Sequence, residues 1–182
     1  MSQLADLAGD LGVDERTLRR AADQGTLRAE RQSPRKLILA PGEAGYLRRQ
    51  WPLLGALRGA LRTEPNVAFA VLFGSAARGD EDADSDVDLM VALRDHSLDG
   101  MVELQGRLEE RLAKKVDVLS VEQASSNALL LAMAVEDGRV LVDRIDLWAS
   151  LSSELGGLRR RAERTAARER RQALASIDGF LS

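Results

Sequence analysis

The sequence predicts an α+β protein with three parts. Apolar residues recur at helical spacing near both ends of the chain, whereas short apolar runs bounded by turn residues indicate strands in the middle. The length of 182 residues is enough for one domain or two small ones around a buried core. We expect a first domain over residues 1–50, an α/β domain over residues 51–146 and a C-terminal helical segment over residues 147–182.

Charge is distributed unevenly along the chain. The net charge of −3 is the balance of +4 over residues 1–62, −10 over residues 63–146 and +3 over residues 147–182. An acidic middle suits a metal-ion site, and a basic first part suggests contact with nucleic acid.

Composition excludes several classes of protein. With 45% hydrophobic and 30% charged residues, the chain has the make-up of an ordinary soluble protein. No apolar run approaches the length that spans a bilayer, and the N-terminus lacks the basic-then-apolar pattern of a signal peptide. The absence of cysteine excludes disulfides and thiolate metal sites. We therefore expect a cytoplasmic protein without membrane contact.

The first 40 residues predict two helices and a hairpin. A first helix, ending near Gly12, is indicated by the apolar residues Leu4, Leu7, Ala8 and Leu11. Asp14 is a favourable N-cap for a second helix over residues 15–24, which Gly25 ends. Short strands over residues 27–31 and 36–39 flank a turn that contains Pro34. Helix, tight turn, helix and β-hairpin together make a winged helix-turn-helix.

The stretch from Leu7 to Arg19 resembles the N-terminal DNA-binding domain of MerR-like and excisionase-like regulators. In that geometry the second helix enters the major groove, and basic residues of the wing contact phosphates. The candidate DNA-binding residues are Arg16, Thr17, Arg19 and Arg20 on the helix and Arg31, Arg35 and Lys36 on the wing. Two other interpretations stay open, because arginines on an exposed helix face are usually solvated and winged helices also dock proteins.

Two helices are expected next. The first covers residues 43–50, and Pro52 starts a second, whose apolar stripe ends at Arg62. The domain boundary is expected near Trp51, which would pack between the two domains.

A Gly-Ser turn and two nearby carboxylates form the most informative stretch. The apolar strand over residues 67–73 leads into Gly74-Ser75, and Asp86 and Asp88 stand at the head of a second strand over residues 87–93. Because residues two apart on a strand share a face, the two carboxylates project together. Carboxylates held side by side repel unless a cation lies between them, and such oxygen ligands suit Mg²⁺.

Three further residues extend this candidate site. Gly74 allows the backbone to approach a ligand closely, and Ser75, at the start of a short helix, offers its hydroxyl and N–H groups to an anion. Arg78, one turn later, can contact a phosphate. Asp117 lies between apolar residues on an expected strand over residues 116–120 and would supply a third carboxylate.

This pattern resembles the nucleotidyltransferase superfamily that includes DNA polymerase beta, and specifically its small bacterial minimal nucleotidyltransferase branch. The matching residues are Gly74, Ser75, Arg78, Gly79, Ser85, Asp86, Asp88 and Asp117. The resemblance implies a mixed sheet with flanking helices and transfer of a nucleoside monophosphate from ATP or another NTP to a hydroxyl. The catalytic and metal-binding residues would be Asp86, Asp88 and Asp117, which hold two Mg²⁺ ions, and the nucleotide-binding residues would be Gly74, Ser75 and Arg78.

The rest of the chain predicts two more helices, a strand and a helical tail. The helices are expected over residues 98–115 and 124–136, and the short strand over residues 139–142. The arginine-rich tail has apolar residues at near-helical intervals and is expected to break or bend at Gly156-Gly157. Its first half is expected to pack on the α/β domain. An oligomer contact, a partner contact and extra basic surface toward nucleic acid all stay open for the second half.

The resemblance also implies a biological role. Members of the minimal branch are often antitoxins paired with a HEPN-family RNase toxin, which some of them silence by adding AMP to a tyrosine. The expected function is therefore AMP transfer from ATP to a protein hydroxyl by the antitoxin of such a pair, which also binds DNA to repress its own operon.

Two alternatives stay open. One is a transcription regulator whose transferase fold senses a nucleotide or docks a partner without catalysis. The other is a small-molecule nucleotidyltransferase, similar to those that modify aminoglycosides, for which Glu122 is the nearest candidate base.

Overall fold

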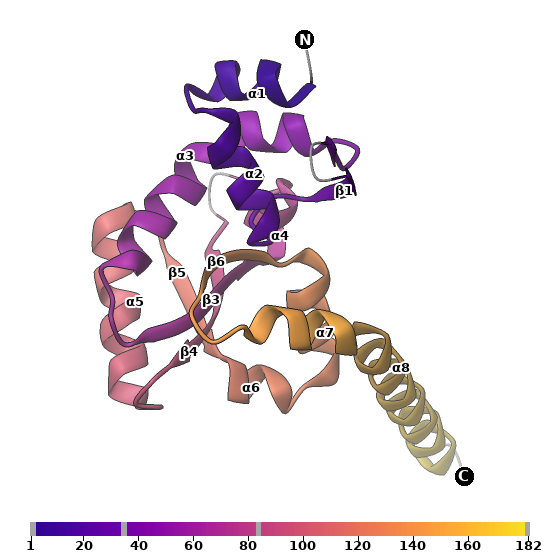
Figure 1. The fold of residues 1–182 in the computed structure, drawn as a ribbon. Helices are drawn as coiled ribbons and strands as arrows, with labels where there is room; N and C mark the ends of the chain where they lie inside the picture. The colour runs from indigo at the N-terminus through magenta and orange to yellow at the C-terminus, as the bar shows by residue number, and fades with distance from the viewer. Residues whose placement is uncertain (1–2, 34–35, 83–84, 181–182) are drawn as a thin grey trace.

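The computed structural model describes residues 3–33, 36–82 and 85–180, and the side chains of residues 173–180 are not described. The described chain forms a four-stranded sheet with helices on both faces, a β-hairpin beside it and a long C-terminal helix (Figure 1).

The central sheet is mixed, as the sequence resemblance implied. Its strands are β3 (Val67–Phe73), β4 (Val87–Leu93), β5 (Val116–Ser120) and β6 (Arg139–Asp143), in the order β5-β4-β3-β6. Strand β3 pairs antiparallel with β4 and β6, and β4 pairs parallel with β5. The parallel pair brings the first residues of β4 and β5 to the same end of the sheet.

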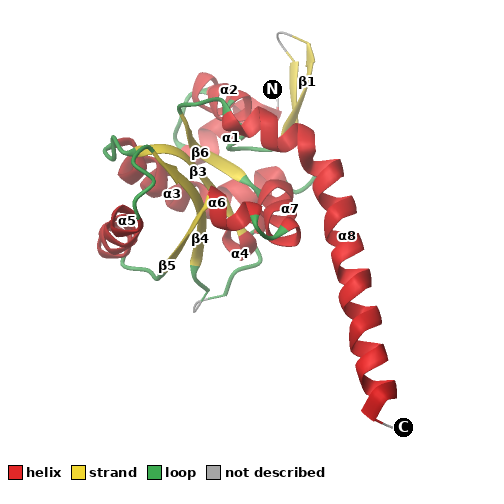
Figure 2. Ribbon diagram, turned by 90° about the horizontal axis from the view of Figure 1, so that it is seen from below, coloured by secondary structure: helices red, strands yellow, loops and turns green. Residues whose placement is uncertain are grey.

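Alternate residues of the strands fill two hydrophobic cores. Ala70 and Leu72 belong to a core built with α3 (Glu43–Arg62) and α5 (Leu98–Leu112). Phe69 and Val71 belong to a second core, built with α6 (Val121–Ser125), α7 (Ala128–Asp137) and α8 (Leu147–Phe180). Figure 2 shows α3 and α5 on the side of the sheet opposite to α7.

The N-terminal elements occur in the predicted order. They are α1 (Gln3–Leu11), α2 (Glu15–Asp23), β1 (Ala29–Ser33) and β2 (Lys36–Leu39), and the two strands pair antiparallel. Asp14 caps α2, because its carboxylate accepts a hydrogen bond of 2.7 Å from the backbone N–H of Thr17. The expected wing residue Arg35 lies outside the described residues.

Helix α3 corrects the prediction of two helices separated near Trp51. The structure has one helix from Glu43 to Arg62, with Pro52 in its interior. A proline inside a helix removes a hydrogen bond and costs about 3 kcal/mol in an isolated helix. Here the helix buries Leu47 before the proline and Leu57 after it, both fully inaccessible to solvent. Burial of one continuous apolar stripe offsets the local cost.

The helix predicted over residues 124–136 is also divided differently. The structure has α6 and α7 in its place, because Asn127 interrupts the run and caps α7 by accepting hydrogen bonds from the N–H groups of Leu129 and Leu130. Helix α5 ends at Leu112, three residues earlier than predicted, where Ala113 adopts a left-handed conformation with φ 49°.

Helix α8 is continuous through Gly156-Gly157, so the predicted break is wrong. Its first turns pack Leu151 and Leu158 into the second core. In both ribbon views its later turns extend away from the sheet (Figures 1 and 2). None of the helices in the described part of the chain combines the length and apolarity that crossing a bilayer requires.

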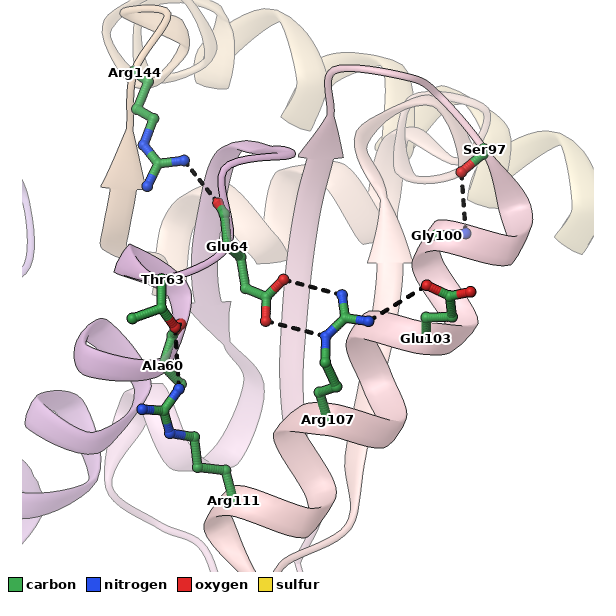
Figure 3. Close-up of polar contacts among 9 residues, drawn as sticks. All are labelled: Ala60, Thr63, Glu64, Ser97, Gly100, Glu103, Arg107, Arg111 and Arg144. Carbon is green, nitrogen blue, oxygen red and sulfur yellow. Dashed lines mark hydrogen bonds and ion pairs between the residues drawn. The ribbon is translucent and has the colours of Figure 1, made fainter.

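The end of α3 is held by arginines of two other elements (Figure 3). Arg107 of α5 donates hydrogen bonds of 3.1 and 3.0 Å to the carboxylate of Glu64. Arg144, which follows β6, donates to the carbonyl oxygen of Glu64 at 2.8 Å and to that of Arg62 at 3.3 Å. The C-terminal turns of α3 are therefore fixed against both α5 and β6.

A buried ion pair joins the N-terminal elements to the sheet. Arg139 of β6 is 1% exposed and makes two hydrogen bonds to Glu43 of α3, at 2.6 and 3.0 Å. The same carboxylate accepts the backbone N–H of Arg28 at 3.0 Å. The guanidinium of Arg139 also lies 3.4 Å from the ring centroid of Tyr46. Residues before and after α3 thus share one buried polar cluster.

Candidate active site

Three strand ends meet at one end of the central sheet. Phe73, the last residue of β3, pairs with Asp88 near the start of β4. In the parallel β4–β5 pair, Asp88 is in turn the register partner of Asp117. The Gly-Ser turn and the carboxylates predicted from the sequence are therefore brought together.

The carboxylates also share a face of the sheet. Val87, Leu89 and Val116 point into the core under α3 and α5. Because strand residues alternate, Asp88 and Asp117 lie on the other face. Burial of Asp88, followed by the negative charges of Asp117 and Asp86, raises the pKa of the Asp88 carboxyl above its ordinary value.

Gly74 is required by its contact with Asp88. Its φ is +72°, a left-handed conformation that a residue with a side chain rarely adopts. A Cβ atom at this position would lie 2.3 Å from Oδ2 of Asp88, closer than van der Waals contact permits. The Gly-Ser turn therefore packs directly against one of the candidate metal ligands.

Lys115 is a residue of this site that the sequence reasoning missed. Its ammonium group forms an ion pair with Asp86 and lies 3.8 Å from Oδ1 of Asp117. The hydrogen bond to Asp86 and the charge of Asp117 raise the pKa of Lys115. Its position directly before the strand that carries Asp117 was the signal in the sequence.

The donor set fits a hard divalent cation. The part of the chain that the structure describes contains no group of three acidic, His or Cys side chains arranged as a metal site. The Lys115 ammonium, however, already holds a positive charge between Asp86 and Asp117. Asp88 and Asp117 share a face of the sheet, Asp86 shares the Lys115 ammonium with Asp117, and carboxylate oxygens are the ligands that Mg²⁺ prefers.

Arg78 is paired with two carboxylates. Its guanidinium donates to Asp137 at 2.6 Å and to Asp80 at 3.1 Å, and these hydrogen bonds raise its pKa. Its positive charge acts on Asp88, lowering the pKa of that carboxyl against the larger effects that raise it. Arg78 therefore lies near the carboxylates but is not aimed freely at a ligand.

The short helix α4 (Gly74–Arg78), which carries Ser75, is held from behind by two buried side chains. The hydroxyl of Tyr46 donates to the carbonyl oxygen of Ala76 at 3.1 Å, and Arg139 donates to that of Ala77 at 2.7 Å. Burial raises the pKa of Tyr46 to about 12, so its hydroxyl stays protonated and remains a donor. Neither support was predicted, because both come from distant parts of the sequence.

Glu122 lies at the other end of β5 from Asp117, on α6. Its carboxylate is 3.2 Å from Nδ1 of His96, and both side chains are exposed. This candidate base of the small-molecule alternative is therefore separated from the carboxylates by the length of the strand.

The predicted DNA-binding residues that the structure describes fall into three groups. Arg16, Thr17 and Arg20 line a groove between α2 and α3. Arg19 forms an ion pair with Glu15 at 3.1 Å, and Arg31 forms one with Asp23. Lys36 is exposed at the start of β2.

Comparison with known protein families identifies the class of this chain. The family described as polymerase beta, nucleotidyltransferase matches residues 56–146, which is half of the chain and includes the whole central sheet. The chain belongs to this nucleotidyltransferase family.

Solved structures with a similar fold include toxin–antitoxin complexes. A chain of a toxin–antitoxin crystallised with AMP-PNP is 23% identical, with a TM-score of 0.50, and the match covers 71% of this chain and 98% of that one. A chain from the complex of a tri-AMPylated Shewanella oneidensis HEPN toxin with its MNT antitoxin is 23% identical, with a TM-score of 0.46 and coverages of 73% and 99%. No curated protein sequence matches the chain.

Proposed function

We propose that this protein is a Mg²⁺-dependent nucleotidyltransferase that transfers AMP from ATP to a protein hydroxyl. The observation that carries the proposal is the meeting of Gly74, Asp88 and Asp117 at one end of the sheet, on one face and in register. Membership of the polymerase beta nucleotidyltransferase family supports the reaction class.

In the proposed mechanism, Asp86, Asp88 and Asp117 would hold two Mg²⁺ ions. Bound magnesium supplies activation of the acceptor hydroxyl and charge neutralisation on the phosphates. The acceptor hydroxyl loses its proton to solvent as its oxygen forms a bond to the α-phosphorus of ATP, and the bond from that phosphorus to the bridging oxygen breaks, so that pyrophosphate leaves. The contribution of the protein is positioning: Gly74 and Ser75 hold the phosphates beside the carboxylates, and Arg78 adds positive charge nearby.

The proposed acceptor is the toxin of a HEPN-type toxin–antitoxin pair, and this chain is its antitoxin. Support comes from the solved toxin–antitoxin with AMP-PNP, whose fold this chain shares along most of its length. The AMP-PNP in that complex also fits ATP as the nucleotide used here.

Transfer of label from α-labelled ATP, with and without Mg²⁺, tests the proposal. The protein is assayed alone and with the product of the adjacent gene, and the Asp86→Asn/Asp88→Asn variant is assayed beside it. A matched control, Asp99→Asn/Glu110→Gln, removes two carboxylates from exposed positions on α5. We expect label on the neighbouring protein with the wild type and the control variant, and none with Asp86→Asn/Asp88→Asn.

Three results would contradict the proposal. Label transfer that survives in Asp86→Asn/Asp88→Asn would rule out the site. Absence of label on any acceptor, while ATP and Mg²⁺ still bind, would favour a regulator whose transferase fold senses the nucleotide. Label on an aminoglycoside rather than a protein would favour the small-molecule alternative. The position of Glu122, at the other end of β5 from Asp117, argues against that alternative.

We further propose that residues 1–50 form a winged helix-turn-helix that binds DNA and represses the operon of the pair. Support comes from the order of α1, α2 and the β1–β2 hairpin and from the basic side chains on α2 and β2. The contacts are assigned to Arg16, Thr17, Arg19, Arg20, Arg31, Arg35 and Lys36.

Binding of the intact chain to its own promoter fragment tests this second proposal. We expect binding at low salt, and a decrease of about two in the salt slope for the wing variant Arg31→Gln/Lys36→Gln, roughly one for each phosphate contact. The control Arg170→Gln/Arg171→Gln removes the same charge from exposed positions on α8. Failure of the intact chain to bind at low salt would overturn it.

A further inference from the structure

A groove of about 590 Å³ between α2 and α3 is lined by four arginines. Arg16 and Arg20 come from α2, and Arg58 and Arg62 come from α3. Within each pair the residues are four apart, so their side chains follow one another along one face of their helix. The four arginines therefore line the same space from two sides, and the charges of Arg62 and Arg20 act on Arg58 within it.

This groove carries a surplus of positive charge. Other arginines of the described chain, such as Arg48 and Arg107, are paired with a carboxylate, that of Asp10 and that of Glu64 respectively. Among the described residues, the side chains of Arg16, Arg20 and Arg62 form no hydrogen bond or ion pair, and Arg58 donates to the neutral amide of Gln24 at 2.6 Å. Burial of Arg58, and then the charges of Arg62 and Arg20, lower its pKa. Such mutual repulsion is relieved when an anion binds.

The floor of the groove leaves room for a ligand. Gly55 and Gly59 of α3 line it, one turn apart, and a Cβ atom at either position would meet nothing within 4 Å. Asp14 is the one carboxylate in the lining among the described residues, and its side chain is engaged as the N-cap of α2. The end of α3 is fixed by Arg107 and Arg144, so its two arginines project from a rigid support.

We propose that the groove between α2 and α3 is a binding site for a multiply charged phosphate anion, separate from the nucleotide site at the end of the sheet. Guanidinium groups bind phosphate oxygens in pairs of parallel hydrogen bonds, and a concave surface of one charge sign concentrates anions. Convergence into a hollow favours a compact polyphosphate, whereas an extended nucleic-acid backbone can present its phosphates along the rim. The shared chemistry is the phosphate group, and the site needs no metal.

Calorimetric titration of the full chain with inorganic tripolyphosphate, in low salt and with EDTA, tests this site. EDTA removes divalent cations, so the proposed transferase site makes little contribution. We expect the wild type to bind and Arg58→Gln/Arg62→Gln to bind about tenfold or more weakly. The control Arg170→Gln/Arg171→Gln removes two exposed arginines from the far part of α8 and is expected to bind like the wild type.

Thermal unfolding separates loss of the site from loss of the fold. Removal of two repelling charges is expected to leave the midpoint of Arg58→Gln/Arg62→Gln unchanged or higher. Equal affinities of this variant and the control, or no binding by the wild type, would overturn the proposal. A failure of AMP transfer would leave it standing, because the groove shares no residue with the carboxylate site.

Competition by a short DNA duplex identifies the source of the phosphate. Displacement of tripolyphosphate by the duplex would show that the groove also binds the phosphodiesters of DNA. If tripolyphosphate stays bound, the groove binds compact anions only. Either result, together with loss of binding in Arg58→Gln/Arg62→Gln, supports a phosphate site.

Discussion

Oδ2 of Asp88 lies where a side chain on Gly74 would begin, 2.3 Å from the position of a Cβ atom. The Gly74→Ala variant must therefore move either the turn or the carboxylate, and it also forces alanine into a left-handed conformation with φ +72°. We expect a loss of about 1–3 kcal/mol in the free energy of unfolding and a loss of AMP transfer.

Thermal or urea unfolding and the transfer assay check this expectation. The matched control is Gly106→Ala on α5, where a Cβ atom would meet nothing within 4 Å. Alanine there is expected to stabilise the helix by up to about 1 kcal/mol. Full activity in Gly74→Ala would show that the contact with Asp88 does not matter for catalysis.

Lys115 holds the position of a cation between Asp86 and Asp117. We expect Lys115→Gln to bind Mg²⁺ or Mn²⁺ at lower concentration than the wild type, because the ammonium group no longer competes for the two carboxylates. Titration followed by Mn²⁺ electron paramagnetic resonance measures this directly. The neighbouring exposed Lys114→Gln changes the net charge equally and is expected to have a smaller effect. Weaker metal binding in Lys115→Gln would instead assign this lysine a supporting role.

The Arg139–Glu43 pair is almost fully buried, with side chains 2% and 3% exposed. Arg139→Met leaves the Glu43 carboxylate without its partner, and we expect a loss of about 3–5 kcal/mol in the free energy of unfolding. The double variant Arg139→Met/Glu43→Leu removes both charges and is expected to recover part of this loss. Urea unfolding of the two single variants and the double variant gives the coupling energy. Additive losses in this cycle would refute direct coupling of the two side chains.

Asp14 gives the protein a predictable response to acid. Hydrogen bonds from Thr17 hold the pKa of Asp14 below its ordinary value of 3.8. A carboxyl whose pKa is lower in the folded than in the unfolded protein stabilises the fold at pH values above its unfolded-state pKa. That stabilisation is lost as the pH falls through its folded-state pKa. Asp14→Ala is therefore expected to melt at a lower temperature than the wild type at pH 7, with the gap closing below about pH 3.8.

Thermal melts between pH 2.5 and 7, a range that spans about one unit or more on each side of the ordinary value of 3.8, measure the gap. Glu110→Ala, at an exposed position late in α5, serves as the control and is expected to change the midpoint little. A gap of constant size across the range would contradict the capping role of the charged carboxylate.

The strands of the central sheet could be predicted because their signal is local. The runs over residues 67–73 and 87–93 are apolar and bounded by turn residues, and both strands have the predicted bounds. The shared face of Asp88 and Asp117 follows from the two-residue period of a strand. The family resemblance implied only that the sheet is mixed, and the folded structure shows which strands pair and in which direction.

The remaining features depend on contacts between distant residues. A proline such as Pro52 normally indicates the start of a helix, but α3 continues through it because apolar side chains on both sides of the proline are buried. Glu43 and Arg139 are 96 residues apart, and no local pattern distinguishes them from surface charges. The convergence of Arg16 and Arg58 likewise depends on how α2 packs beside α3. Only the folded arrangement reveals these supports.

Helix α3 has a consequence for how this architecture can be inherited. The same helix packs Leu47 and Leu57 into one core with α1 and α2 before it and the sheet after it, and its Glu43 reaches across to Arg139. A gene fragment ending at codon 50 would encode only the first turns of that helix. Recombination that exchanges the N-terminal elements between proteins would therefore have to transfer α3 with them. Otherwise the α3 of the recipient would have to pack against α1 and α2 helices that it did not evolve with.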